Sequence, residues 1–114
     1  MQEYEQAAIS YNQALPIKND YTDAWNNRGV ALSKLQKYEA AIASYDNAAK
    51  IRPDFYRIWY NKARCYALQA KIELAIENLK RAFNLNPNVC KELAKTEADL
   101  EKIREHEAFK QLIN

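Results

Sequence analysis

Few residues in this sequence could take part in catalysis, and they are widely separated. His106 is the only histidine, and it stands among charged residues, where we expect an exposed side chain. A general base needs a serine or cysteine nucleophile beside it, and no spacing in the chain places one near His106. A phosphate-binding loop needs several glycines, whereas Gly29 is the only glycine. The sequence therefore predicts a protein that is not an enzyme.

The two cysteines do not form a metal-site motif. Cys65 and Cys90 have neither Cys-x-x-Cys spacing nor partner histidines. We favour reduced, half-buried thiols in a cytoplasmic protein over a disulfide or a metal ion. Carboxylates such as Glu39 and Asp46 fall on amphipathic helical patterns and are most simply solvated. No cofactor and no metal is expected.

The composition is that of one globular, all-helical domain. The chain has 114 residues, of which 48% are hydrophobic and 28% charged, with three prolines and little material for strands or tight hairpins. Its net charge of +2 is too small for a nucleic-acid partner. It has no run of about 18 apolar residues and does not open with a signal-peptide pattern, so we expect no membrane partner and a cytoplasmic location.

An internal repeat of 34 residues organises the chain. It divides the sequence into a half repeat at 1–21, full repeats at 22–55 and 56–89, and a C-terminal segment at 90–114, all within a single domain, 1–114. Asp20, Asp54 and Asn88 keep the same step and are residue types that cap helices. The other matching positions are Trp25 and Trp59, Ala41 and Ala75, Ala48 and Ala82, Pro53 and Pro87, and, one step earlier, Tyr4 and Tyr38, Ala7 and Ala41, Tyr11 and Tyr45, Ala14 and Ala48.

Each full repeat contains two helical patterns joined by a polar turn. In the first full repeat Trp25, Leu32 and Leu35 are apolar at helical spacing, and a second pattern begins at Tyr38 after Gln36-Lys37. Pro53 ends the second helix because its ring and missing N–H cannot continue it. The pattern predicts antiparallel helix hairpins with small residues where the two helices approach closely.

These residues resemble the tetratricopeptide repeat family. The resemblance covers about residues 1–89 and implies an all-α fold, an α-solenoid of antiparallel helix hairpins with two full units, one N-terminal half unit and C-terminal capping helices. Pentatricopeptide repeats, which bind RNA, have a period of 35 residues and lack this signature. The residues that carry the resemblance are Trp25, Gly29, Leu32, Tyr38, Ala41, Tyr45, Ala48 and Pro53 in the first full unit, and Trp59, Ala63, Tyr66, Ala75, Leu79, Ala82 and Pro87 in the second.

The half repeat leaves a face that a neighbouring unit would normally cover. Pro16 in this segment precedes the repeat's proline position, so its helix is expected to end or bend near Leu15. Either the chain is a piece of a longer array, or it covers this face by self-association. We expect a homodimer or concentration-dependent association through this end. The residues of the predicted self-association face are Tyr4, Ala7, Ala8, Tyr11 and Leu15.

The C-terminal segment departs from the repeat and carries many charges. "VCKELAK" predicts a short helix starting after the Asn88 cap, and Thr96 with Asp99 imitates a capping box for a further helix carrying Leu100 and Ile103. Phe109, together with Leu112 and Ile113, forms a last apolar patch. The segment resembles the solvating helix that closes bacterial tetratricopeptide arrays.

The family resemblance implies a concave groove, lined by the first helices of successive repeats, that binds a peptide or a partner helix. The predicted groove is basic with one acidic member, so we expect a protein or peptide partner, with acidic peptides as one class. Clustered cations bind carboxylates through charge-assisted hydrogen bonds. The residues carried over are Asp23, Asn26, Asn27, Val30 and Lys34 from the first full repeat, Arg57, Tyr60, Asn61, Arg64 and Leu68 from the second, and Lys91 and Lys95 from the next helix.

Two other interpretations of these positions stay open. In a subfamily that clamps the C-terminal carboxylate of chaperone tails, Asn61, Lys91 and Lys95 match the clamp, whereas Asn26 and Val30 do not. Alternatively, the basic residues lie on a solvated helix face and bind nothing. The leading function is a noncatalytic scaffold or adaptor, and the alternative is a structural or regulatory fragment of a longer array that self-associates through the half repeat.

Gly29 lies inside a predicted helix, where glycine costs about 1 kcal/mol relative to alanine. We expect it where the two helices of the hairpin come closest. Ala63 occupies the equivalent position of the next repeat, which predicts that alanine is tolerated at position 29 and that leucine is not.

Overall fold

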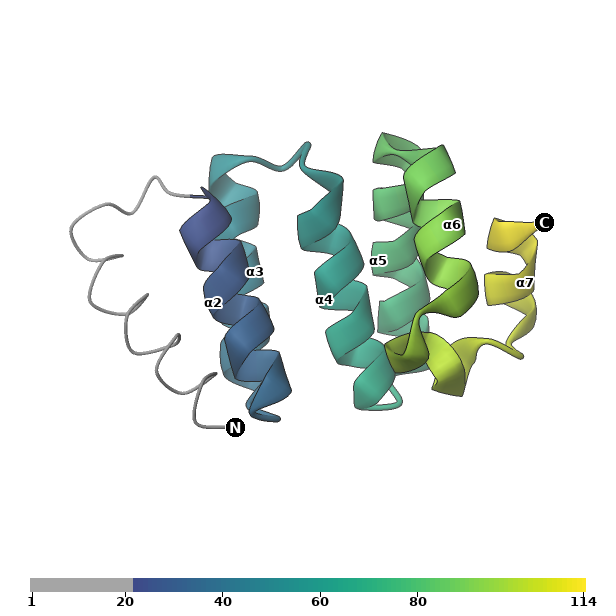
Figure 1. Ribbon diagram of the computed structural model, residues 1–114, viewed down its shortest axis with the longest axis horizontal. Helices are drawn as coiled ribbons and strands as arrows, with labels where there is room; N and C mark the ends of the chain where they lie inside the picture. Colours follow the sequence, from purple (N-terminus) through teal and green to yellow (C-terminus); the bar gives the residue numbers. More distant parts are fainter. Residues whose placement is uncertain (1–21) are drawn as a thin grey trace. The chain divides into compact units, whose positions relative to one another are not determined.

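The computed structural model of this chain describes residues 22–114. The chain forms two compact units, Met1–Asp54 and Phe55–Asn114. In the described part every regular element is a helix (Figure 1). None of these helices has the length and apolar character needed to cross a bilayer. The predicted half repeat at 1–21, its bend near Leu15 and the self-association face at Tyr4, Ala7, Ala8, Tyr11 and Leu15 lie outside the described residues.

In the described part of the first unit, α2 (Thr22–Lys34) and α3 (Tyr38–Ile51) form a helix hairpin. The two helices bury facing stripes of small and large apolar side chains at helical spacing. Pro53 follows the end of α3, as predicted from the missing N–H. The buried apolar side chains of this hairpin are Ala31, Leu32, Ala41, Tyr45 and Ala48.

The second unit repeats the hairpin and adds three further elements. Helices α4 (Tyr56–Leu68) and α5 (Ile72–Leu85) pack on each other, and α6 (Pro87–Thr96) packs on α5. A 3₁₀ helix, η1 (Ala98–Ile103), then returns to α4. The final helix, α7 (Glu107–Ile113), contacts α5 and α6 (Figure 1). The C-terminal segment is thus packed against the hairpin of its own unit.

Both hairpins make the same turn, again 34 residues apart. Gln36 and Ala70 have left-handed backbone conformations, with φ of 63° and 60°. In each turn the next N–H bonds a carbonyl five residues back, Lys37 to Leu32 at 2.9 Å and Lys71 to Tyr66 at 3.0 Å. These bonds define a Schellman motif, which satisfies the free carbonyls at a helix end. The repeat in sequence is therefore also a repeat in backbone geometry.

Tyr45 explains the glycine in α2. A Cβ atom at Gly29 would lie 2.7 Å from Cδ1 and 2.8 Å from Cζ of the Tyr45 ring. That ring is 2% exposed, so it has no room to move aside. The position equivalent to Tyr45 in the next repeat is Leu79, which packs in the hairpin that has Ala63 in place of glycine. Ala63 is therefore a poor guide to whether alanine fits at position 29. The residue that faces Gly29 is Tyr45, whereas the corresponding residue of the next hairpin is Leu79.

The predicted starting points of two helices, one after Asp54 and one after Asn88, are wrong. Helix α4 has Phe55 as its N-cap, and α6 has Asn86, neither with a side-chain cap bond. Pro87 begins α6, because its fixed φ and missing N–H suit the first helical position.

The capping box predicted at Thr96 and Asp99 is also wrong. Helix α6 extends through Thr96, and the next element has Glu97 as its N-cap without a side-chain cap bond. That element is a 3₁₀ helix of six residues rather than a longer helix, and Leu100 and Ile103 on it are fully buried. Its charged residues therefore accompany a packed segment, not a purely solvating one.

The two free thiols are fully buried, whereas the sequence predicted half-buried ones. From the burial of Cys90 we expect a loss of stability at alkaline pH. The Sγ of Cys90 donates to the carbonyl of Ala82 at 3.3 Å, and burial raises the pKa of the Cys90 thiol to about 11. Above the ordinary thiol pKa, the unfolded state releases this proton while the folded state keeps it, so ionisation favours unfolding. We expect the free energy of unfolding to fall by about 1 kcal/mol between pH 8.5 and 10 from this group.

Urea denaturation at several pH values measures this loss. The variant Cys90→Ala should start from a lower stability but decline less steeply over the same pH range. Equal slopes in the variant and the parent would show that the Cys90 thiol does not titrate differently in the two states.

Candidate functional site

The predicted groove residues of α2 follow one stripe of that helix. Asp23, Asn27 and Lys34 are exposed, and Val30 is half-buried. Asn26 is buried, with 7% of its surface exposed. The spacing of three and four residues brings these positions to one side of α2, and Asn26 lies at the buried edge of that stripe.

The predicted groove residues of α4 range from exposed to buried. Arg57 is exposed, whereas Asn61, Arg64 and Leu68 are half-buried. Tyr60 is only 4% exposed. The element η1 packs against α4, and Glu97, which precedes η1, pairs with Arg64.

Arg64 is the centre of a charged cluster on α4. Its Nε lies 2.7 Å from Oε1 of Glu97, and its Nη2 lies 2.9 Å from Oδ2 of Asp99. Its Nη1 also donates to Oδ1 of Asn61 at 3.3 Å. The three charged side chains are each about a quarter exposed, 23% for Arg64. One guanidinium therefore holds two carboxylates from a segment more than thirty residues later in the chain.

Further contacts fasten the same segment. Nζ of Lys102 donates to the carbonyl of Leu68 at 3.0 Å, near the C-terminal end of α4, where a cation is favourable. Arg104 donates to the carbonyl of Glu97. Leu100 and Ile103 are 0% exposed. Residues 97–103 thus contact α4 through the carboxylates of Glu97 and Asp99 and the amino group of Lys102, and the same segment buries two apolar side chains.

The hydroxyl of Tyr60 lies beside this cluster without a hydrogen-bond partner in the described structure. Burial raises the pKa of Tyr60, and the Glu97 carboxylate raises it further, while the positive charge of Arg64 opposes both. A buried hydroxyl without a partner loses the hydrogen bonds it makes in water, which costs about 1–3 kcal/mol. The packing around Tyr60 therefore includes the cost of an unsatisfied polar group.

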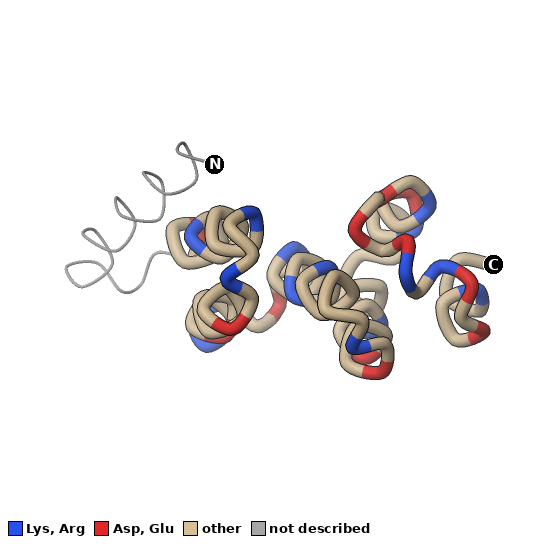
Figure 2. Tube along the Cα trace, turned by 90° about the horizontal axis from the view of Figure 1, so that it is seen from below, with Lys and Arg blue, Asp and Glu red and all other residues tan. Residues whose placement is uncertain are grey.

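The two lysines of α6 lie differently. Lys91 is half-buried, and Lys95 is exposed and pairs with Glu92 one turn earlier at 3.2 Å. Figure 2 shows blue and red mixed along the helices of each unit rather than one face of a single sign. The basic character predicted for the groove is thus offset in the second unit by the chain's own Glu92, Glu97 and Asp99.

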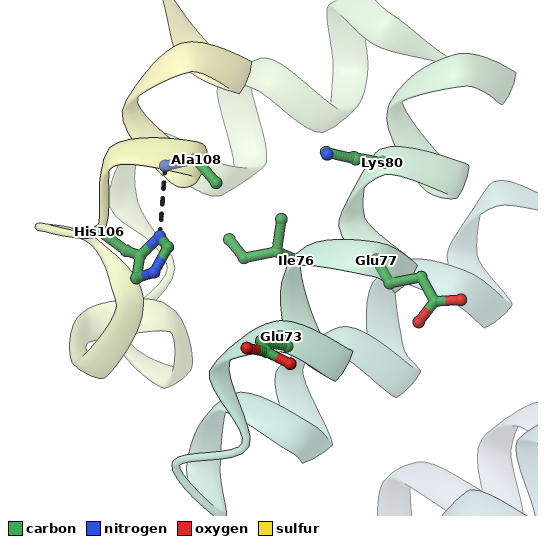
Figure 3. Close-up of a pocket in the computed structure, with 6 residues that line it drawn as sticks. All are labelled: Glu73, Ile76, Glu77, Lys80, His106 and Ala108. Carbon is green, nitrogen blue, oxygen red and sulfur yellow. Dashed lines mark hydrogen bonds between the residues drawn. The ribbon is translucent and has the colours of Figure 1, made fainter.

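His106 is exposed and caps a helix. Its Nδ1 accepts a hydrogen bond from the N–H of Ala108 at 3.2 Å, at the start of α7 (Figure 3). It borders an open pocket of about 270 Å³ that is otherwise lined mainly by α5. Ile76 points toward His106 in this pocket, whereas Glu77 points away from it (Figure 3). Among residues 22–114, no three histidine, cysteine or acidic side chains gather so as to hold a metal ion.

Sequence reasoning missed Glu97 and Asp99 as members of the site. The sequence predicts a solvating C-terminal segment and places Asp99 in a capping box. In "TEADLEKI" the acidic residues Glu97 and Asp99 precede Leu100 and Ile103, which are the buried residues of this segment. Leu100 and Ile103 are three residues apart, which is helical spacing, so the sequence carries no signal that Glu97 and Asp99 meet a cation on another helix.

Helix hairpins repeating at 34 residues, with the same turn in each, define a class of helical repeat proteins. Family models described as "Tetratricopeptide repeat" match residues 22–55 and 56–89, and one described as "TPR repeat" matches residues 1–36. The chain belongs to the tetratricopeptide repeat family. A search of curated proteins found no match.

Solved structures support the same fold class. The Yersinia enterocolitica type III secretion chaperone SycD, in complex with a peptide of the translocator YopD, is 20% identical, with a TM-score of 0.77 over 90% of this chain and 81% of that one. The TPR2B domain of yeast Sti1 in its pHsp70 complex is 23% identical, with a TM-score of 0.76 over 96% and 86%. A double mutant of MamA RS-1 is 19% identical, with a TM-score of 0.70 over 97% and 66%. The predicted all-α solenoid of helix hairpins is confirmed.

Proposed function

We propose that this chain is a noncatalytic protein-interaction module, a scaffold or adaptor that binds a peptide or a partner helix on the face formed by the first helices of its repeats. Two structures of the same fold, SycD and the TPR2B domain of Sti1, are described as complexes with a YopD peptide and pHsp70. The proposed binding residues are those carried over in the sequence analysis, on α2, α4 and α6.

One observation supports this proposal above the others. The α4 side chain of Arg64 binds the carboxylates of Glu97 and Asp99, which belong to a segment that is not part of the hairpin. This intramolecular contact uses the pairing of a guanidinium with carboxylates that we propose for an external peptide. It favours an acidic partner, because a guanidinium binds carboxylates in a fixed geometry.

A fluorescence-anisotropy titration tests the proposal. Three labelled peptides of equal length, one acidic, one basic and one neutral, are added to the wild-type chain and to Arg57→Ala/Arg64→Ala. We expect the acidic peptide to bind most tightly, to lose at least about tenfold in affinity in the double variant, and to bind more weakly as salt rises. This loss corresponds to about 1.4 kcal/mol.

The matched control is Lys50→Ala/Lys80→Ala. It removes the same charge from exposed positions on α3 and α5, the second helices of the hairpins, and should leave the affinity unchanged. An equal loss of affinity in both double variants would mean that the effect comes from the net charge alone. The proposal is wrong if no peptide binds either the wild-type chain or Glu97→Gln/Asp99→Asn, in which the carboxylates on Arg64 are replaced by amides.

A further inference from the structure

We propose that residues 97–103 are a built-in competitor at the binding face of α4, and that the external partner is a segment of the same chemistry. That chemistry is two carboxylates separated by one residue and followed by apolar side chains. The inference rests on the proposed function, because it names the partner class and the regulation of that same face.

The contacts of this segment define what a replacement must supply. Glu97 and Asp99 satisfy one guanidinium, that of Arg64, at 2.7 and 2.9 Å. Leu100 and Ile103 fill apolar space completely, since both are 0% exposed. A partner that brought carboxylates alone would leave that space to water, so the apolar residues belong to the recognised pattern.

The segment is also placed so that it can leave while the hairpin stays intact. It is a six-residue 3₁₀ helix, which is a weaker structure than an α-helix. A single extended residue, Glu97, with φ of −70° and ψ of 117°, joins it to α6. On the side of this segment, its polar contacts with α4 come from the side chains of Glu97, Asp99 and Lys102. They join Arg64 and the carbonyl of Leu68, the last residue of α4, so they can break without unfolding that helix.

The state in which residues 97–103 lie on α4 has a free-energy cost, and the departure of these residues removes that cost. The Tyr60 hydroxyl is buried beside Glu97 and Arg64 and has no partner in the described structure. Once residues 97–103 move away, that hydroxyl can bond to water or donate to a carboxylate of the incoming segment. The structure thus contains an unused donor next to the cation that would hold an acidic ligand.

Competition of this kind lowers the apparent affinity for the partner without changing the face itself. The measured dissociation constant is the intrinsic one divided by the fraction of molecules in the open state. Because residues 97–103 are tethered, they compete at a high effective concentration. Weakening their hold on Arg64 should therefore tighten the binding of an external segment.

The test uses a labelled peptide with the sequence of residues 96–103, TEADLEKI, and the full-length chain. Anisotropy titrations compare the wild type with Glu97→Gln/Asp99→Asn, which keeps the shape of both side chains and removes their charge. We expect at least about tenfold tighter binding to the variant, and loss of that binding when Arg64→Gln is added. A peptide with the two acids changed to amides, TQANLEKI, should bind at least about tenfold more weakly than TEADLEKI.

The matched control variant is Glu101→Gln/Glu105→Gln. It makes the same change in net charge at two exposed residues, one within residues 97–103 and one just after them, and should bind TEADLEKI as the wild type does. Equal affinity of the wild type and Glu97→Gln/Asp99→Asn would overturn the competition while leaving the proposed function standing. Absence of binding to every variant would instead reject the proposed function.

Hydrogen exchange separates displacement from a general loss of folding. In the wild type, saturating TEADLEKI should speed the exchange of the Leu100 N–H, which bonds the carbonyl of Glu97 at 3.2 Å. Amides inside α4 and α5 should keep their protection. Unchanged exchange at Leu100 in the complex would overturn the proposal, because the peptide would then bind without displacing the segment.

Discussion

Replacing Gly29 by leucine should lower the free energy of unfolding by about 3 kcal/mol. A Cβ atom alone would lie 2.7 Å from Cδ1 of the Tyr45 ring, and the further atoms of leucine would lie deeper in the same contact. The ring is 2% exposed and cannot turn into solvent without opening the hairpin. Urea denaturation followed by circular dichroism measures the change. Asn27→Leu, at an exposed position of α2, is the control and should change stability by less than about 0.5 kcal/mol.

The cause of this effect can be isolated by a double-mutant cycle. Gly29→Ala should also destabilise, because the added methyl meets the Tyr45 ring and this outweighs the gain of about 1 kcal/mol in helix propensity. In the background Tyr45→Leu, which copies the Leu79 of the next repeat, the same change should become stabilising. Such a change of sign measures the coupling between the two positions directly. Gly29→Ala that stabilises the parent chain would contradict the proposed contact.

Replacing Phe109 by alanine should lower the free energy of unfolding by about 3–5 kcal/mol. Phe109 is 0% exposed on α7, a helix of seven residues that contacts α5 and α6. So short a helix is unstable alone in water and depends on this side chain for its position. We expect the second unit to lose cooperativity and α7 to lose its protection from hydrogen exchange.

The control for this prediction is Leu85→Ala. Leu85 is 43% exposed at the end of α5, so its truncation removes a similar apolar side chain without leaving a buried cavity. It should cost less than about 1 kcal/mol. If Phe109→Ala is as mild as Leu85→Ala, the C-terminal segment contributes little to the stability of the second unit.

The hairpins could be predicted from sequence because their information is local and repeated. Matching residues 34 positions apart, such as Trp25 and Trp59, mark equivalent places in two helices. Apolar residues at helical spacing indicate which face is buried. The left-handed backbone at Gln36 and Ala70 could not be predicted, because neither position has the glycine or asparagine usual there.

The candidate site could be predicted only in part. Helix position placed Arg57, Asn61 and Arg64 on one side of α4, and the structure keeps them exposed or half-buried there. It could not show that Tyr60 is covered or that Arg64 already holds two carboxylates. Those facts depend on a segment that returns to α4 from 35 residues later, and no periodicity in the sequence encodes such a return.

The sequence by itself determined that this is an all-helical repeat protein of two-helix units, because repetition and helical periodicity act over short distances. The tertiary structure decided what each exposed or buried position faces. Gly29 is required by the ring of Tyr45, sixteen residues away, and the charge of Arg64 is used by Glu97 and Asp99. Packing and ion pairing depend on which side chains contact each other in space. The contacting side chains belong to helices and turns that lie far apart in the sequence.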